Sequence, residues 1–221
     1  MSVLLGYSNG SFEDQIRIST GSTPQSVAVG DFNNDTRLDI VVGNSGSNDM
    51  SIFLGYDNGS FTNQMKFSAG TMPWSLAVDD FNNDTTLDIV VTNYQSSGVG
   101  VLLRYLKVEF LQQSTLTAGN GSQPRSFVIG DFNNDYRMDV IVASSGSSSI
   151  AIFLGCGNYS FADPTQYSTG SRPISIATGD FNNDNRLDVV VANLLCGCGC
   201  VHEEEIFPPT HTHTLLFIKP L

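Results

Sequence analysis

The chain has 221 residues, of which 40% are hydrophobic, and a formal net charge of −12. This length and composition allow one large domain or two small ones, each with a hydrophobic core. The acidic balance argues against nucleic acid as a partner, and the sequence has no apolar run of the roughly 20 residues that a membrane-spanning helix needs.

The first residues, MSVLLGYSNGSF, lack the basic start and apolar core of a signal peptide. They match the later segments SIFLGYDNGSF from Ser51 and IAIFLGCGNYSF from Ile150. The chain therefore begins inside a repeat, which indicates a fragment or a truncated gene model. Six Asn-x-Ser/Thr triplets are compatible with a secreted protein.

A nine-residue acidic phrase divides the chain into repeats. Its copies begin 49, 51 and 49 residues apart and read DFNNDTRLD from Asp31, DFNNDTTLD from Asp80, DFNNDYRMD from Asp131 and DFNNDNRLD from Asp180. A fixed period of roughly 20–50 residues is typical of solenoids, propellers and arrays.

Each repeat predicts four short antiparallel strands. In the first complete copy, Pro24 precedes the alternating residues 26–29, and the β-branched run 40–42 follows the acidic phrase. The third strand is expected at 51–54, and a weaker fourth strand after the turn at Asn58-Gly59, where we expect a two-residue hairpin with both residues at positive φ. Four-stranded units repeated at this length predict the blades of an all-β propeller.

Complete blades are predicted at 24–70, 73–119 and 124–170. Residues 2–20 supply the third and fourth strands of a further blade, and residues 173–193 supply the first and second. These halves either close the ring as a fourth blade or were cut from a larger ring. In the second blade, residues 104–109 replace the Gly-Tyr-x-Asn-Gly-Ser turn, so that hairpin is expected to be lost or rebuilt.

Two regions follow from this organisation. Residues 1–193 are predicted to be a propeller or a propeller fragment. Residues 194–221 have no repeat character and contain all three His residues and three of the four Cys residues. We expect this tail to be disordered.

The acidic phrase has the spacing of a cation-binding loop. Positions one, three, five and nine carry oxygen ligands at Asp31, Asn33, Asp35 and Asp39, and the carbonyl of Arg37 can complete the set. Calcium takes six to eight oxygen ligands in flexible geometry, whereas magnesium demands a stricter octahedron, so calcium is favoured. The alternative is that Asp and Asn only form Asx turns that close a hairpin.

An EF-hand loop also opens with D-x-N-x-D, but it requires Gly at position six and Glu at position twelve. Here position twelve is a valine within a predicted strand in every copy (Val42, Val91, Val142 and Val191). The EF-hand is therefore excluded.

With these four loops, each followed by an apolar strand, the chain resembles the FG-GAP/VCBS repeat family of integrin α-subunit-like propellers over residues 1–193. The resemblance implies up to four Ca²⁺ ions. For the other three loops, the resemblance implies equivalent ligand sets. These are Asp80, Asn82, Asp84, Thr86 and Asp88 in the second loop, Asp131, Asn133, Asp135, Arg137 and Asp139 in the third, and Asp180, Asn182, Asp184, Arg186 and Asp188 in the fourth. The family pattern has Gly at position six, where this chain has Thr36, Thr85, Tyr136 and Asn185, and a Thr is strained there if φ is positive.

The resemblance also implies an extracellular or cell-surface adhesion scaffold that binds a protein or a glycan and uses calcium mainly for structure. No nucleophile and base pair emerges from the sequence, so we expect no catalytic residues and no enzyme activity. Two alternatives stay open: a fragment without independent function, and a propeller enzyme that acts on glycans or lipids.

Overall fold

The computed structural model describes residues 1–82, 84–106, 109–157, 160–194 and 213–218. The chain forms two compact units, Met1–Ser96 with Gly100–Thr115, and Ser97–Val99 with Leu116–Leu221. Within the described part, every regular element is a strand, and none of these residues forms a helix that could cross a membrane. The chain is therefore an all-β protein, as the repeat pattern predicts.

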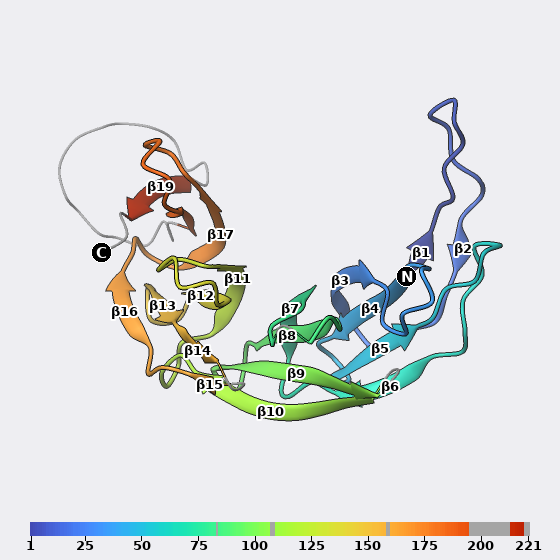
Figure 1. Ribbon diagram of the computed structural model, residues 1–221, viewed down its shortest axis with the longest axis horizontal. Helices are drawn as coiled ribbons and strands as arrows, with labels where there is room; N and C mark the ends of the chain where they lie inside the picture. Colours follow the sequence, from blue (N-terminus) through green and yellow to red (C-terminus); the bar gives the residue numbers. More distant parts are fainter. Residues whose placement is uncertain (83, 107–108, 158–159, 195–212, 219–221) are drawn as a thin grey trace. The chain divides into compact units, whose positions relative to one another are not determined.

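The first unit begins with a short pair, β1 (Ser2–Val3) and β2 (Ile16–Arg17). A four-stranded antiparallel sheet follows, in the order β3 (Pro24–Gly30), β4 (Asp39–Asn44), β5 (Asp49–Phe53) and β6 (Met65–Ser68). The next sheet contains β7 (Pro73–Asp79), β8 (Asp88–Asn93), β9 (Gly98–Leu106) and β10 (Glu109–Thr117) (Figure 1).

The second unit repeats this plan. Its four-stranded sheet has the order β11 (Pro124–Gly130), β12 (Asp139–Ser144), β13 (Ser149–Phe153) and β16 (Thr165–Ser168). A small hairpin of β14 (Gly155–Gly157) and β15 (Ser160–Phe161) lies between β13 and β16 in the sequence. The last sheet contains β17 (Pro173–Gly179), β18 (Asp188–Leu194) and β19 (His213–Ile218).

Three complete blades and two incomplete ones agree with the predicted strand order. The strand β19 was not expected, because residues 213–218 belong to the tail that was predicted to be disordered. The remaining tail residues, 195–212 and 219–221, lie outside the described residues. Closure of the two incomplete blades into one stays a prediction.

The first strands of the four larger sheets, β3, β7, β11 and β17, begin in the same way. A proline opens each of them, and the register with the second strand shifts over the next two residues, as between Pro24 and Ser26. The first position of a strand and a bulge are where a sheet tolerates proline. The residue before each proline has a positive φ of 48–55°, at Thr23, Met72, Gln123 and Arg172.

The turns at Asn9-Gly10 and Asn58-Gly59 differ from the predicted two-residue hairpin. Gly10 and Gly59 have φ of 85° and 75°, whereas Asn9 and Asn58 do not have positive φ. Gly10 N donates to Tyr7 O at 3.1 Å. These contacts describe a three-residue loop, with a type I turn followed by Gly in the left-handed region.

The core of the first unit lies between its two four-stranded sheets. Val41 and Ile52, from β4 and β5, pack with Leu76 and Val91, from β7 and β8. Successive side chains of a strand point to opposite faces, so the neighbouring Ile40 and Val42 belong to a separate cluster on the other face of the β3–β6 sheet.

Candidate cation-binding loops

The four acidic phrases occupy equivalent connections in the fold. Each joins the first strand of a sheet to the second, at residues 31–38, 80–87, 131–138 and 180–187. The paired residues Gly30 and Asp39 close the first of these connections. The same strand pairing closes the other three.

In the first loop, Asp31 and Asp35 organise the backbone. Asp31 Oδ1 accepts hydrogen bonds from Asn33 N at 3.2 Å and Asp35 N at 3.1 Å, and its Oδ2 accepts from Thr36 N at 2.7 Å. Asp35 Oδ1 accepts from Arg37 N at 2.9 Å. Asn33 Nδ2 donates to Asp35 Oδ2 at 3.0 Å. The structure therefore brings positions one, three and five together.

The same contacts recur in the other loops. In each of them, the first aspartate accepts from the N–H groups at positions five and six, and the asparagine at position three donates to the aspartate at position five. The residues concerned are Asp80, Asn82 and Asp84 in the second loop, Asp131, Asn133 and Asp135 in the third, and Asp180, Asn182 and Asp184 in the fourth.

The aspartate at position nine has different hydrogen-bond partners from these three positions. Asp39 is fully buried, and its Oδ2 accepts from Phe32 N at 2.7 Å while its Oδ1 accepts from Gly55 N at 2.8 Å. The carboxylate thus ties its own loop to the end of β5. Asp88 and Asp139 make the equivalent pairs of contacts, and Asp188 accepts from Phe181 N.

Burial perturbs the position-nine carboxylates. It raises the pKa of Asp39 and Asp139, and it raises the pKa of Asp88 to about 6. For Asp39, the negative charges of Asp35 and Asp31 add to this rise. In these three loops, a carboxylate is therefore desolvated beside like charges, which disfavours its charged form.

At position seven, sequence reasoning considered only the backbone carbonyl. The Arg37 guanidinium pairs with Asp35 at 3.2 Å and with Asp57 at 2.6 Å. Arg137 pairs with Asp135 at 3.5 Å in the third loop. In the second loop, the Thr86 hydroxyl instead donates to Asp84. A hydrogen bond from the Arg37 backbone, followed by the polar side chains around it, holds the pKa of Asp35 below its ordinary value.

Arg104 was noticed in the sequence only as part of a degraded turn, but it reaches the first loop. Its side chain is 8% exposed, and it donates from Nη1 to Phe32 O at 2.5 Å and from Nη2 to Asn34 Oδ1 at 2.9 Å. Its backbone N donates to Asp88, as Gly55 and Gly155 do to their own aspartates. A Cβ on Gly55 would lie 2.3 Å from the Leu38 carbonyl oxygen, so the backbone around Arg104 must differ locally.

Position six has positive φ in all four loops, which is the condition under which a Thr was expected to be strained. The values are 72° at Thr36, 67° at Thr85, 65° at Tyr136 and 63° at Asn185. Position four is left-handed as well, at Asn34, Asn134 and Asn183, with φ of 58–59°. Asn83 lies outside the described residues. Asn enters this region at low cost, which explains the second asparagine of the DFNND phrase.

The donor chemistry of the loops suits a hard cation. Positions one, three and five offer carboxylate and amide oxygens, and no loop contains His or Cys. Among the described residues, however, no three His, Cys, Asp or Glu side chains are already gathered at one point. The position-nine carboxylates remain predicted ligands, because their oxygens serve backbone N–H groups in this structure.

Comparisons with known proteins agree with the fold. A family model described as an FG-GAP-like repeat matches residues 1–42, 31–91, 80–142 and 131–191. None of the curated proteins matches the chain.

Solved structures are similar at low sequence identity. Virginiamycin B lyase from Staphylococcus aureus is 14% identical over 86% of this chain and 55% of its own, with a TM-score of 0.56. A protein of unknown function from Desulfotomaculum acetoxidans is 15% identical over 87% and 58%, with a TM-score of 0.63. A Lactobacillus plantarum protein is 16% identical over 97% and 62%, with a TM-score of 0.60. The chain thus spans less than two thirds of the length of these structures, and the likeness concerns the fold alone.

Proposed function

This chain belongs to the family of FG-GAP-like repeat proteins, and on that premise we propose that it is a calcium-binding propeller scaffold that binds a protein or a glycan outside the cell. The observation that carries the proposal is the repeated loop. In each copy, carboxylates at positions one and five and an amide at position three lie together, beside a buried carboxylate at position nine.

The role of calcium in this proposal is structural. A cation at positions one, three and five would offset the repulsion that contributes to the raised pKa of Asp39. An ion that binds only the folded state stabilises it by RT ln(1 + [L]/Kd), about 2.7 kcal/mol per site when calcium exceeds Kd a hundredfold. Sites with Kd near ~10⁻⁴–10⁻³ M suffice for an extracellular protein.

The scaffold role is proposed to be non-enzymatic. The loop carboxylates are engaged with backbone N–H groups, and the histidines are confined to residues 202–213. General acid and base catalysis needs a titratable group within hydrogen-bond reach of a substrate, and in this proposal the loop carboxylates serve the backbone and the cation instead.

The experiment that tests calcium binding is a thermal melt of the full chain with calcium, with magnesium and with a chelator. We expect the melting temperature to rise by several degrees with millimolar calcium and by much less with magnesium. Equal melts in all three solutions would sink the calcium proposal and leave the loops as Asx turns. The ligand proposal is tested by a glycan array probed with and without calcium.

A further inference from the structure

The hairpins between β1 and β2 and between β5 and β6 carry the same five-residue turn, Tyr-x-Asn-Gly-Ser, at residues 7–11 and 56–60. In the first turn, Tyr7 N donates to Ser11 O at 2.8 Å, and Gly10 N donates to Tyr7 O at 3.1 Å. The equivalent distances in the second turn are 2.9 and 3.0 Å. Each turn contains an Asn-x-Ser triplet, which is an acceptor sequence for N-linked glycans.

The serine of each triplet holds the asparagine side chain in one orientation. Asn58 Oδ1 accepts hydrogen bonds from Ser60 N at 3.0 Å and from the Ser60 hydroxyl at 2.6 Å. Asn9 Oδ1 accepts from Ser11 N at 3.0 Å and from the Ser11 hydroxyl at 2.7 Å. Because Oδ1 takes both hydrogen bonds, Nδ2 is the atom of each amide that remains for a sugar. Both asparagines are exposed.

A tyrosine lies on the same face of each turn as this amide. The bridge between Gly55 and Phe61 sets the register of the second hairpin and places Tyr56 opposite Ser60. Side chains of directly opposite residues in an antiparallel pair project from one face. Since the Ser60 hydroxyl also contacts Asn58, the ring, the hydroxyl and the amide share that face. The first turn has the same register and the same contacts.

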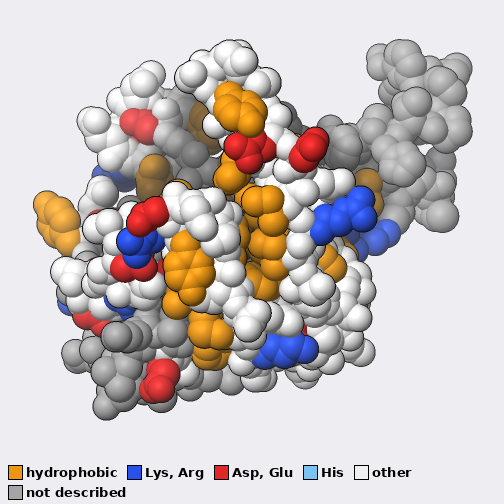
Figure 2. Space-filling model, turned by 90° about the vertical axis from the view of Figure 1, so that its right-hand side faces the viewer, with side chains coloured by type: hydrophobic (Ala, Val, Ile, Leu, Met, Phe, Trp, Pro, Cys, Tyr) orange, Lys and Arg blue, Asp and Glu red, His pale blue; other side chains and the backbone are white. Residues whose placement is uncertain are grey.

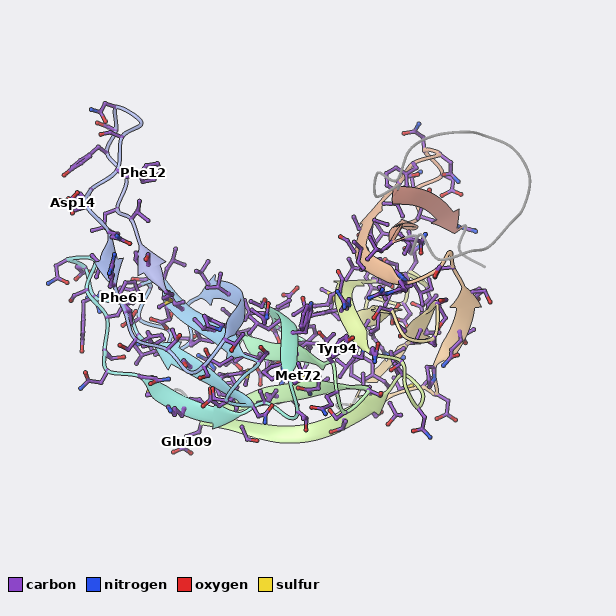
Figure 3. The ribbon with its side chains drawn as sticks, turned by 180° about the vertical axis from the view of Figure 1, so that it is seen from behind. Phe12, Asp14, Phe61, Met72, Tyr94 and Glu109 are labelled. Atoms are coloured by element: carbon purple, nitrogen blue, oxygen red, sulfur yellow. The ribbon has the colours of Figure 1, made fainter. Side chains whose placement is uncertain are left out.

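The two tyrosine rings are open to contact from solvent, because Tyr7 and Tyr56 are each 53% exposed. Figure 2, which views the side of Figure 1 where β1 to β6 lie, shows hydrophobic side chains at the surface there. Figure 3 labels Phe12 and Phe61, which follow the two turns in the sequence. The face of an aromatic ring is electron-rich, so it attracts the C–H groups of a sugar ring that stacks on it.

The other described triplets differ from these two. Phe32 has the same spacing from Asn34 as the tyrosines have from their asparagines, but Phe32 is fully buried. Asn34 Oδ1 also accepts from Arg104, which is 8% exposed. In the triplet at Asn120, Ser122 is fully buried, and its hydroxyl donates to a backbone carbonyl at 3.4 Å. Two further triplets, at Asn83 and Asn158, include residues outside the described part of the chain.

We propose that Asn9 and Asn58 carry N-linked glycans and that the first sugar of each packs on the tyrosine of its own turn. The donor is an oligosaccharide linked to a lipid pyrophosphate. A bond forms between Nδ2 and C1 of the first sugar as the bond between C1 and the pyrophosphate oxygen breaks. The pyrophosphate keeps the electron pair, and Nδ2 loses one proton. This inference rests on the extracellular location in the proposed function, because the secretory route supplies that donor.

The test of the acceptor sites is the full chain secreted from cultured eukaryotic cells behind an added signal peptide. Glycans are released by an amidase in heavy-oxygen water, which converts each glycosylated Asn to a labelled Asp and separates it from earlier deamidation. Mass spectrometry of the peptides then gives the occupancy of each triplet. We expect sugar at Asn9 and Asn58 and none at Asn34 or Asn120. Ser60→Ala should remove only the glycan of its own turn.

The contact with tyrosine is tested by melting the secreted chain, trimmed to the first sugar, beside the same chain made without sugar in bacteria. We expect each glycan to raise the melting temperature by about 2–4 °C through its aromatic contact. Tyr7→Ala and Tyr56→Ala should each remove about half of the total rise, and together all of it. Tyr136→Ala is the control, because this tyrosine is 92% exposed and lies outside the two turns, and it should leave the rise unchanged.

A secreted chain without sugar at Asn9 and Asn58 would overturn the proposal, and so would equal occupancy at Asn34 and Asn120. A rise in melting temperature that survives the loss of both tyrosines would refute the stacking. If the secreted chain is modified but the natural protein carries no sugar, the extracellular location is wrong and the acceptor geometry stands. The calcium melt is a separate measurement, so its failure leaves these outcomes as they are.

Discussion

Left-handed residues at positions four and six give the acidic loops their shape. The side chain of Asp31 accepts from Asp35 N and Thr36 N only because the backbone turns back on itself between them. Asn tolerates this conformation, but a β-branched residue with φ of 72° is strained by roughly 1–2 kcal/mol. The loop keeps its shape despite this cost because several hydrogen bonds define it together.

Thr36→Gly should therefore stabilise the protein. The gain from relieved strain exceeds the backbone entropy cost of Gly, which is roughly 0.5–1 kcal/mol, so we expect a net gain of about 0.5–1 kcal/mol in urea unfolding. Asn185→Gly is the matched control, since Asn is already tolerant of φ near 63°. A gain as large from Asn185→Gly would contradict the strain argument.

The buried Asp88 makes stability depend on pH. Its folded pKa of about 6 lies above the unfolded value near 3.9, so the folded state holds the proton more tightly. The resulting stabilisation is fully present below pH ~4 and is lost as pH rises through about 6.

In chelator, we expect the midpoint of urea unfolding to fall as pH rises from about 4 to about 6, and Asp88→Asn to flatten this change. Asp163→Asn, at an exposed carboxylate outside the loops, should leave the slope as it is. A wild-type midpoint that rises over this range would show that the other carboxylates dominate.

At the scale of elements, Arg104 joins two sheets. It belongs to β9, yet its guanidinium donates to Phe32 O and Asn34 Oδ1 in the loop between β3 and β4. A hydrogen bond with a charged donor contributes about 1.5–3 kcal/mol to the stability of the folded protein. The planar fork of Arg reaches both acceptors at once, which the single ammonium of Lys does not reproduce.

We expect Arg104→Ala to destabilise the protein by about 2–4 kcal/mol, and Arg104→Lys to recover only part of this loss. Arg37→Ala removes an exposed guanidinium with a similar number of contacts, and it should cost under about 1 kcal/mol because solvent screens its ion pairs. Thermal or urea unfolding measures both. Equal losses for the two variants would contradict a bracing role for Arg104.

The sequence predicts the elements well because each repeat carries its own period-2 strands. The four larger sheets lie where the proline, the acidic phrase and the β-branched runs place them. The type of turn predicted at Asn58-Gly59 was wrong, because the same dipeptide occurs in two-residue and in three-residue hairpin loops. The partner of Arg104 lies 72 residues away in the sequence and leaves no local signal.

Two further features could not be predicted for similar reasons. The positive φ at Met72 runs against the usual extended preference before proline, and it is held by Tyr94 N, which donates to Met72 O at 2.9 Å (Figure 3). The position-nine aspartates were expected to face a cation, but the N–H of Gly55 is a competing partner for Asp39 that appears only once β5 is in place.

At the scale of the whole molecule, the four loops are expected to act as separate sites. Each has hydrogen bonds within its own repeat, and only the first two are linked by hydrogen bonds in the described residues, through Arg104, which contacts the first loop and Asp88. Effects at sites without shared partners add, so the loss of the third or the fourth loop should leave the other three unchanged.

Calorimetric titration of the full chain with calcium should therefore give four sites, and Asp135→Ala or Asp184→Ala should each give three. Every site removed should also lower the calcium-dependent rise in melting temperature by a similar step, because each bound ion adds its own RT ln(1 + [L]/Kd) to the stability. Asp163→Ala, outside the loops, should keep four sites. A single substitution that abolishes all binding would mean that the loops fill cooperatively, and a count of four in every variant would mean that position five is not a ligand.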